Sequence, residues 1–209
     1  MGVVGQGIFV FILSGLLSSV IASDIARYSP SLNGTTGLVN TPTAFSLRKN
    51  EGSVGIWGEA SKYPDHDFYF VYGVRNWLEV GVISDLPQHT TPNFLFKINS
   101  QAQDRLFKGF PILAFGLYRS TSYLTASYKI MPLTLNLGTT LSPDRSPLFF
   151  GASLQIANRM LIQLDSDGSD FGIGLRGQVQ PFQFSLTLDG QTGETLSDLK
   201  LHWGAGFHF

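Results

Sequence analysis

The sequence predicts an all-β fold, an antiparallel transmembrane β-barrel of about twelve strands, within a range of about ten to fourteen. Three observations predict it. Apolar and polar side chains alternate with period two along many segments, short and long connections alternate between those segments, and 43% of the residues are hydrophobic while 14% are charged. The 209 residues include no cysteine, which excludes a disulfide scaffold, and 14 basic against 15 acidic residues exclude a nucleic-acid-binding surface.

The first 22 residues are predicted to be a signal peptide. The stretch Ile8–Ile21 is uncharged and shorter than the ~20 residues of a spanning helix, and we expect cleavage after Ala22. An uncleaved anchor helix is the alternative. Residues 23–50 form a lead-in rich in Gly, Thr and Ser, too polar to lie in lipid. We expect part of it, centred on Gly37–Ala44, to tuck into or under the barrel at the periplasmic mouth.

Residues 51–209 are predicted to form the barrel. In 133–141, for example, leucines alternate with Thr, Asn and Gly, and because successive strand side chains point to opposite faces, one face is apolar and the other polar. The predicted strands are 52–60, 66–74, 77–84, 92–98, 111–118, 121–130, 133–141, 147–156, 159–165, 169–179, 182–189 and 197–209.

The connections indicate the direction of the strands. Those after the second, sixth, eighth and tenth segments are tight, as at Met131 and Pro132, whereas those after the first, third, seventh, ninth and eleventh are longer and more polar. Outer-membrane barrels have short periplasmic turns and longer outer loops. Two connections break the alternation: 99–110 is long, and Arg119 with Ser120 is short.

The apolar and polar faces of the strands can be assigned to the outside and the inside of the barrel from the solvent that each must meet. A twelve-stranded barrel cannot easily fill its interior with this many Leu and Phe side chains, so the apolar face, with Leu135 as an example, is expected to face lipid. A soluble β-sandwich is the alternative. The predicted pore-lining residues are Glu59, Asp67, Glu79, Lys97, Lys129, Asp165, Arg176, Lys200 and His202, joined by Trp57, Tyr69 and Tyr123. Both signs occur in comparable number, so we expect ion pairs that narrow a small pore with little charge selectivity. A plugged barrel is the alternative.

The last predicted strand carries a further pattern. Its alternation places apolar side chains on one face and His202 with Gly204 on the other, and the sequence ends on Phe209. Gly204, Phe207 and Phe209 resemble the carboxy-terminal β-signal of bacterial outer-membrane proteins. The resemblance implies that the barrel-assembly machinery recognises this strand, which as an exposed edge can be captured by strand pairing.

Four parts of the mature chain resemble recurring pieces of the YjbH family of outer-membrane barrels. They are 37–44 (GLVNTPTA), 77–82 (WLEVGV), 110–118 (FPILAFGLY) with 123–127, and 165–175 (DSDGSDFGIGL). The resemblance implies a barrel in the bacterial outer membrane that is associated with exopolysaccharide production and export. Exopolysaccharide or its export proteins are then the expected partners, together with outer-membrane lipid.

Neither a metal nor a cofactor is expected. Asp165, Asp167, Gly168 and Asp170 are similar to the first half of a calcium loop, but no Glu follows at the required spacing, so a hairpin turn is the favoured interpretation. The four histidines do not have metal-ligand spacing.

The alternative function is an outer-membrane lipid-modifying enzyme of phospholipase or deacylase type. Its catalytic His would stand on the lipid-facing surface. The alternation instead directs His202 and His208 into the lumen, and it places His66 and His89 in outer loops, where Ser61 or Ser84 would be near them only by chance. We therefore expect a non-enzymatic outer-membrane protein, a small pore or an envelope component linked to exopolysaccharide.

Overall fold

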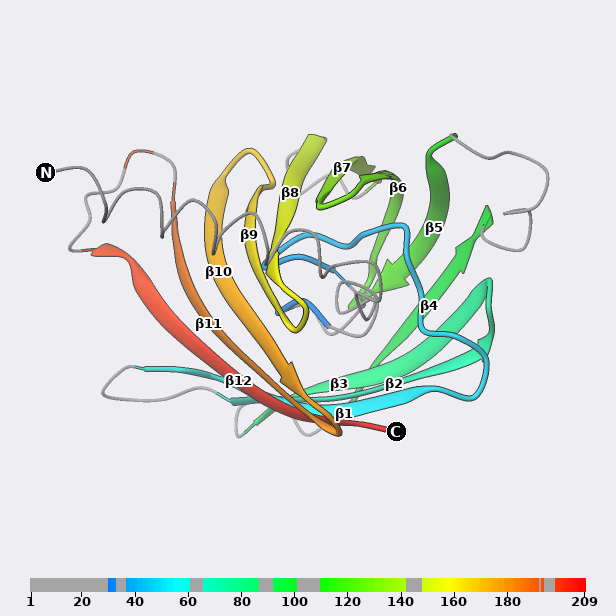
Figure 1. The fold of residues 1–209 in the computed structure, drawn as a ribbon, viewed down its shortest axis with the longest axis horizontal. Helices are drawn as coiled ribbons and strands as arrows, with labels where there is room; N and C mark the ends of the chain where they lie inside the picture. The colour runs from blue at the N-terminus through cyan, green and yellow to red at the C-terminus, as the bar shows by residue number, and fades with distance from the viewer. Residues whose placement is uncertain are drawn as a thin grey trace, which may run out of the picture.

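The computed structural model describes residues 30–32, 37–60, 66–86, 92–100, 110–141, 148–191, 193 and 198–209. Within them, twelve antiparallel strands close into a single barrel in which each strand pairs with its neighbours in sequence and β1 pairs with β12 (Figure 1). The strands are β1 (Gly52–Glu59), β2 (His66–Arg75), β3 (Leu78–Leu86), β4 (Asn93–Asn99), β5 (Ile112–Tyr118), β6 (Thr121–Ile130), β7 (Leu133–Thr140), β8 (Leu148–Ala157), β9 (Met160–Ser166), β10 (Asp170–Val179), β11 (Phe182–Gln191) and β12 (Lys200–His208). The predicted fold class is confirmed.

The strand positions follow the period-two pattern closely. Every predicted strand corresponds to an observed one, and the tight turns fall at Met131–Pro132 and at Gln180–Pro181 as expected. Arg119 and Ser120 form the short β5–β6 turn with positive φ angles of 50° and 83°, the backbone of a two-residue hairpin loop. The predicted signal peptide, residues 1–22, lies outside the described residues.

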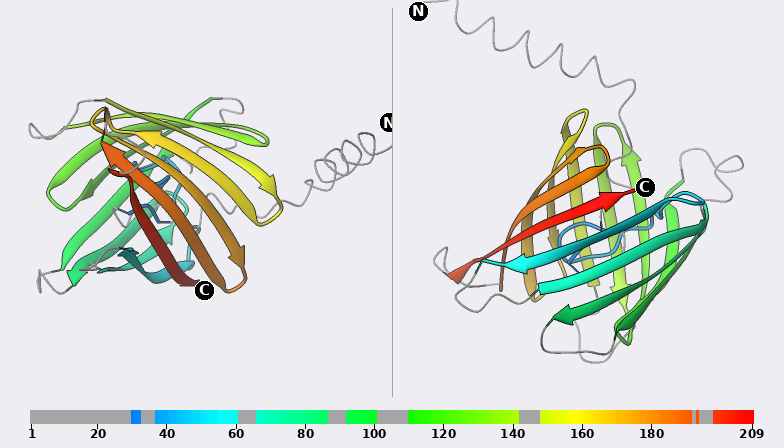
Figure 2. Two further views of the ribbon diagram at one scale, coloured as in Figure 1. Left: turned by 90° about the vertical axis from the view of Figure 1, so that its left-hand side faces the viewer. Right: turned by 90° about the horizontal axis from the view of Figure 1, so that it is seen from below.

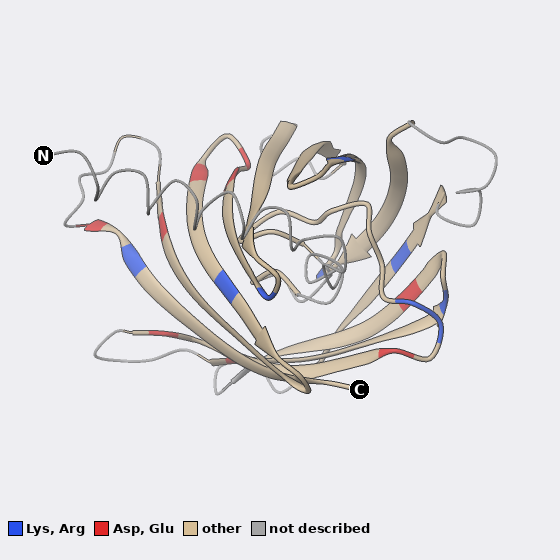
Figure 3. Ribbon diagram, in the orientation of Figure 1, with Lys and Arg blue, Asp and Glu red and all other residues tan. Residues whose placement is uncertain are grey.

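The register fixes which side chains face outward. Leu135 lies opposite Tyr128 and Ala152, and such outward rows continue around the barrel. Apart from Arg75, which ends β2 beyond a bulge at Gly73, no outward-facing position of the described strands is Asp, Glu, Lys or Arg. Charged residues are correspondingly sparse along the strands (Figure 3). The outer surface is therefore an apolar belt with exposed Phe and Leu side chains.

The lumen is occupied by the chain's own N-terminal region. Residues 37–47, here called the plug segment, run inside the ring of strands (Figures 1 and 2). Leu38, Val39, Ala44 and Leu47 in this segment are at most 2% exposed. Of the two expected positions for 37–44, into or under the barrel, the structure has the first, and the segment is buried within the lumen itself (Figure 1).

Among the described residues, no helix has the length and hydropathy required to cross a bilayer.

Candidate functional site: the occupied lumen

The plug segment enters from the end of the barrel where β1 begins and β12 ends, here called the near end. Its tip is a tight turn in which the Leu38 amide donates to the Thr41 carbonyl at 2.9 Å, and Gly37 bridges to Pro42. The Leu32 amide donates to the Val39 carbonyl at 2.8 Å, so residues 30–32 return alongside the turn. The chain therefore inserts into the lumen as a compact loop.

Asp165 of β9 binds the tip of this loop. One carboxylate oxygen, Oδ2, accepts hydrogen bonds from the Asn40 amide at 2.8 Å, the Thr41 amide at 2.8 Å and the Thr41 hydroxyl at 2.9 Å. Hydrogen bonds to a charged acceptor are the stronger kind. On β11, two strands further along the wall, Asp189 Oδ1 accepts from the Asn40 side-chain amide at 2.6 Å. The carboxylates of Asp165 and Asp189, which lie toward the end of the barrel opposite the near end, thus hold the turn.

Arg176 of β10 binds the carbonyl side of the same loop. Its guanidinium donates to the carbonyl oxygens of Gly37 at 2.9 Å, Pro30 at 3.0 Å and Leu38 at 3.1 Å. The side chain is 3% exposed, and its Cζ lies 5.9 Å from the centroid of the Trp57 ring. A charged side chain of the wall therefore bonds to backbone groups of the inserted loop.

Neutral polar groups continue the contact along β6 and β7. The Asn136 side-chain amide donates to the Pro42 carbonyl at 2.9 Å, and the Ala44 amide donates to the Ser127 hydroxyl at 2.8 Å. That hydroxyl in turn donates to Asn136 Oδ1 at 2.6 Å. Polar residues of the predicted lumen face are thus paired with backbone groups of the plug segment, as buried polar groups require.

An ion pair holds the near end of the segment. Lys97 Nζ lies 3.5 Å from Glu79 Oε1, and both side chains are at most 2% exposed. Lys97 also donates to the Phe45 carbonyl at 2.9 Å, while Glu79 Oε2 accepts from the Leu47 amide at 3.1 Å. The pair therefore stabilises the plug segment as well as the wall.

Glycines of the wall leave room for the tip. A Cβ on Gly172 would lie 2.6 Å from Val39 Cγ1, and one on Gly174 would lie 3.0 Å from Val39 Cγ2. A Cβ on Gly151 would overlap the Leu38 side chain. Inward glycines on β8 and β10 thus form the surface against which Leu38 and Val39 pack.

The lumen is also more apolar than the sequence suggested. A buried cluster joins Leu47 of the plug segment to inward side chains of seven strands, namely Trp57, Tyr69, Val71, Ile83, Leu95, Tyr118, Tyr123 and Phe149. The expected inward placement of Trp57, Tyr69 and Tyr123 agrees with this register. The expectation of a polar lumen is corrected, because apolar side chains on both the wall and the plug segment bury one another.

All nine predicted pore-lining residues face inward by register, and the structure separates them into two groups. Glu79, Lys97, Asp165 and Arg176 are buried against the plug segment. The other five lie near the ends of the barrel. Among these, Asp67 pairs with Arg119 at 3.1 Å, Glu59 with Lys200 at 3.7 Å, and His202 lies 4.0 Å from Asp189. Lys129 is exposed opposite Thr134.

These contacts correct the expectation of a small pore narrowed by ion pairs and favour its alternative, a plugged barrel. Ion pairs do occur, but the middle of the lumen is occupied by residues 37–47, and Asp165 and Arg176 bond to that loop. The contacts of the loop are the part of the site that sequence reasoning missed. The signal for them was present in β2 and β3, where inward Tyr69, Val71 and Ile83 make both faces of the strands apolar.

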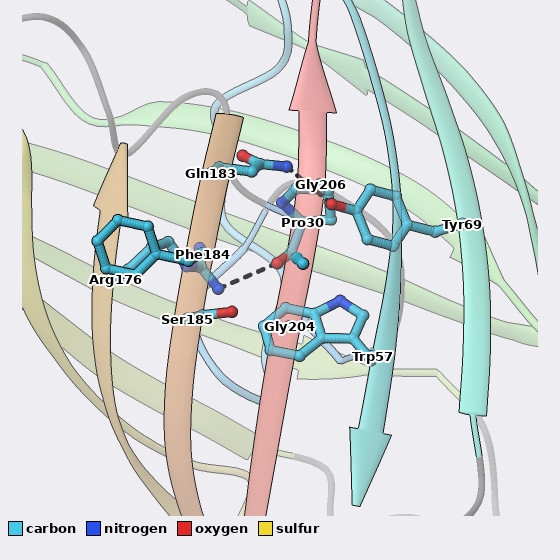
Figure 4. Close-up of a pocket in the computed structure, with 10 residues that line it drawn as sticks. Pro30, Trp57, Tyr69, Arg176, Gln183, Phe184, Ser185, Gly204 and Gly206 are labelled. Carbon is cyan, nitrogen blue, oxygen red and sulfur yellow. Dashed lines mark hydrogen bonds between the residues drawn. The ribbon is translucent and has the colours of Figure 1, made fainter. Parts of the chain in front are cut away.

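A small cavity remains between Pro30 and the wall. Its volume is about 10 Å³, room for one water molecule. Figure 4 shows Pro30 between Arg176 and the side chains of Trp57, Tyr69 and Gln183. The indole Nε1 of Trp57 and the Oε1 of Gln183 are buried and have no hydrogen-bond partner within the described part of the chain.

Two further expectations concern the hairpin turn at 166–170 and the position of His66. Residues 166–170 form the predicted hairpin turn, in which Asp167 Oδ1 accepts from the Ser169 amide, the Ser169 hydroxyl and the Asp170 amide. The placement of His66 in a loop is wrong, because it is the first residue of β2 and faces outward.

The environment of His66 is apolar. Its ring packs edge-on against Trp203 with centroids 5.9 Å apart, and its Nδ1 has no hydrogen-bond partner among the described residues. A catalytic His needs an acidic or amide group that orients its ring, so this geometry does not form a triad. His89 and Ser61 lie outside the residues that the structure describes.

The geometry defines a class of protein, a closed antiparallel β-barrel that contains its own N-terminal segment. No family model matches the chain, and no curated protein matches it. Among solved structures, the N-terminal β-barrel domain of Pseudomonas aeruginosa OprF is similar at 11% sequence identity, over 78% of this chain and 100% of that chain, with a TM-score of 0.30. A TM-score this low does not extend the similarity to the lumen or to function.

Proposed function

We propose that this protein is a bacterial outer-membrane β-barrel whose lumen is a gated passage, with the plug segment as the gate. The observation that carries the membrane assignment is the outer surface, on which the outward positions of the described strands bear no charge apart from Arg75 at one end. In water such a belt would expose a large apolar surface, whereas in lipid it faces a matching solvent. The closed hydrogen-bonding of the strands satisfies the backbone.

The nature of the lumen contacts supports gating. The plug segment is held by hydrogen bonds and by side-chain packing, and it connects to β1 through residues 48–51 at the near end. It is not a strand of the barrel, so the twelve-stranded wall remains closed when the segment leaves. A loop of this kind can move out without breaking the wall's own hydrogen bonds.

Conductance tests the gate. Mature protein folded into planar bilayers is expected to show a mainly closed barrel, whereas deletion of residues 23–47 is expected to give larger and more frequent openings. Equal conductance for both proteins would overturn the gating proposal. Hydrolysis of phospholipid by the purified protein would overturn the expectation, stated above, that the protein is non-enzymatic.

We further propose that the passage serves exopolysaccharide export. Support comes from the resemblance to YjbH proteins, because two of its pieces meet in the lumen: Asn40 and Thr41 of the first bond to Asp165 of the last. Cells that lack the protein should then release less exopolysaccharide than cells that have it. The amount released by a strain carrying the 23–47 deletion should differ from the amount released by either of these. Unchanged release in the deletion strain would contradict the link.

The terminal strand supports assembly by the barrel-assembly machinery. β12 carries Gly204 and Phe207 of the proposed β-signal and closes the barrel against β1, where Gly204 lies opposite Trp57. The Phe209 amide and the Gly52 carbonyl complete this seam at 3.0 Å. Replacing Phe207 by Asp should reduce the folded amount in cells more than replacing it by Leu.

A further inference from the structure

We propose that the lumen wall behind Pro30 is a binding site for a carboxylate-bearing ligand, in which Arg176 binds the carboxylate after the N-terminal residues have moved aside. The site deepens the proposed function, on which it rests, because the ligand must enter the lumen. Its ligand class is a hydroxylated carboxylate, such as a uronic acid unit of an acidic saccharide.

The first argument is the set of groups that Arg176 binds in this structure. The guanidinium donates to three backbone carbonyls, and all three belong to Pro30, Gly37 and Leu38, residues outside the wall. A guanidinium bonds to a carboxylate through two parallel, charge-assisted hydrogen bonds, which are stronger than bonds to neutral carbonyl oxygens. The carbonyls thus occupy positions that the oxygens of a carboxylate would fill with greater strength.

The second argument is two polar atoms without hydrogen bonds, on residues that line the same cavity as Arg176. The Trp57 indole N–H is a donor, the Gln183 Oε1 is an acceptor, and both atoms are buried without a hydrogen-bond partner in the part of the chain described. Buried polar atoms are normally paired, and unpaired ones point to a missing ligand or water. The hydroxyl groups of a ligand supply both acceptors and donors, so two hydroxyls of one saccharide unit match these two atoms.

The third argument is position. Arg176, Trp57 and Gln183 line one cavity, and Pro30 is the lining residue from the N-terminal region (Figure 4). The floor is formed by Gly204 and Gly206 of β12, which carry no side chain into the lumen. The cavity holds about one water molecule now, so a saccharide unit fits only when Pro30 and the plug segment leave. Ligand and plug segment therefore compete.

Competition makes a testable prediction about affinity. If only the fraction of molecules with a displaced plug segment binds, the apparent dissociation constant falls as that fraction rises. Thr41→Val removes the hydroxyl that donates to Asp165 and leaves every residue that lines the cavity unchanged, so it should raise the apparent affinity several-fold. Arg176→Gln should lower it at least tenfold, since a hydrogen bond to a charged group is lost.

The experiment is calorimetric titration of the full chain, folded in detergent, with tetragalacturonate, citrate and maltotetraose as probes. The proposal expects tetragalacturonate to bind, citrate to bind more weakly and neutral maltotetraose not to bind. Arg159→Gln, in the exposed β8–β9 turn, is the matched control and should bind like the unaltered protein. Trp57→Phe keeps the ring but removes the N–H and should weaken binding several-fold.

The outcomes are distinct. Equal binding of maltotetraose and tetragalacturonate, or unaltered binding by both Arg176→Lys and Arg176→Gln, would overturn the site. Arg176→Lys keeps a buried cation and covers the case in which the Gln variant does not fold. No binding by the Thr41→Val protein, although its conductance shows an open lumen, would overturn the site and leave the proposed gate standing. Binding without any change in conductance would support the site and contradict the gate.

Discussion

Removing the carboxylate of Asp165 should release the tip of the plug segment. In Asp165→Ala, the amides of Asn40 and Thr41 and the Thr41 hydroxyl lose an acceptor that they contact at 2.8, 2.8 and 2.9 Å. Hydrogen bonds to charged groups contribute about 1.5–3 kcal/mol each. Since the three share one oxygen and are not additive, we take about 4 kcal/mol for the set.

That free energy corresponds to roughly a thousandfold change in the ratio of displaced to inserted plug segment. The assay is single-channel recording of the full chain in planar bilayers, with open probability as the measured quantity. Asp167→Ala is the matched control, because Asp167 lies in the same hairpin and also accepts three hydrogen bonds, all from within its own turn.

The expected result is a large rise in open probability for Asp165→Ala and little change for Asp167→Ala. Heat-modifiable migration in gel electrophoresis would show that both proteins remain folded barrels. Equal open probability for the two variants would refute the reasoning, because the hairpin and not the bond to the plug segment would then set the conductance.

Three further predictions concern the wall and the lumen. Leu135→Arg should destabilise the barrel in liposomes by about 2–4 kcal/mol if the position lies at mid-bilayer, whereas Leu135→Phe should change its urea midpoint little; equal midpoints would place the residue away from lipid. Gly172→Val should raise the open probability, because its Cβ would lie 2.6 Å from Val39 Cγ1, and an unaltered open probability would show that the tip packs elsewhere. Lys97→Met should lower the free energy of unfolding by about 3–5 kcal/mol by leaving the Glu79 carboxylate buried without this cation, and Glu79→Gln in the same chain should restore part of the loss.

The strands were predictable because their signal is local. Alternation in a segment such as 133–140 decides both its conformation and its two faces, and closure of the barrel preserves that parity around every pair. The inward positions of Asp165 and Arg176 were predicted from the same alternation of side chains.

The partners of these two residues were not predictable. Sequence parity states that Asp165 and Arg176 face the lumen, but it contains no information about which loop returns to meet them more than 120 residues away. The same holds for Asn136, because its inward position follows from the alternation whereas its bond to the Pro42 carbonyl does not.

Covalent locking of the plug segment tests most directly whether it is the gate. The chain has no cysteine, and Val39 Cγ2 lies 3.0 Å from the Cβ position of Gly174, about the distance from a Cβ atom to the far sulfur of a disulfide. Val39→Cys with Gly174→Cys in the Asp165→Ala chain should stay closed when oxidised and should open after reduction. An oxidised, fully cross-linked barrel that conducts as well as the reduced one would contradict the central claim.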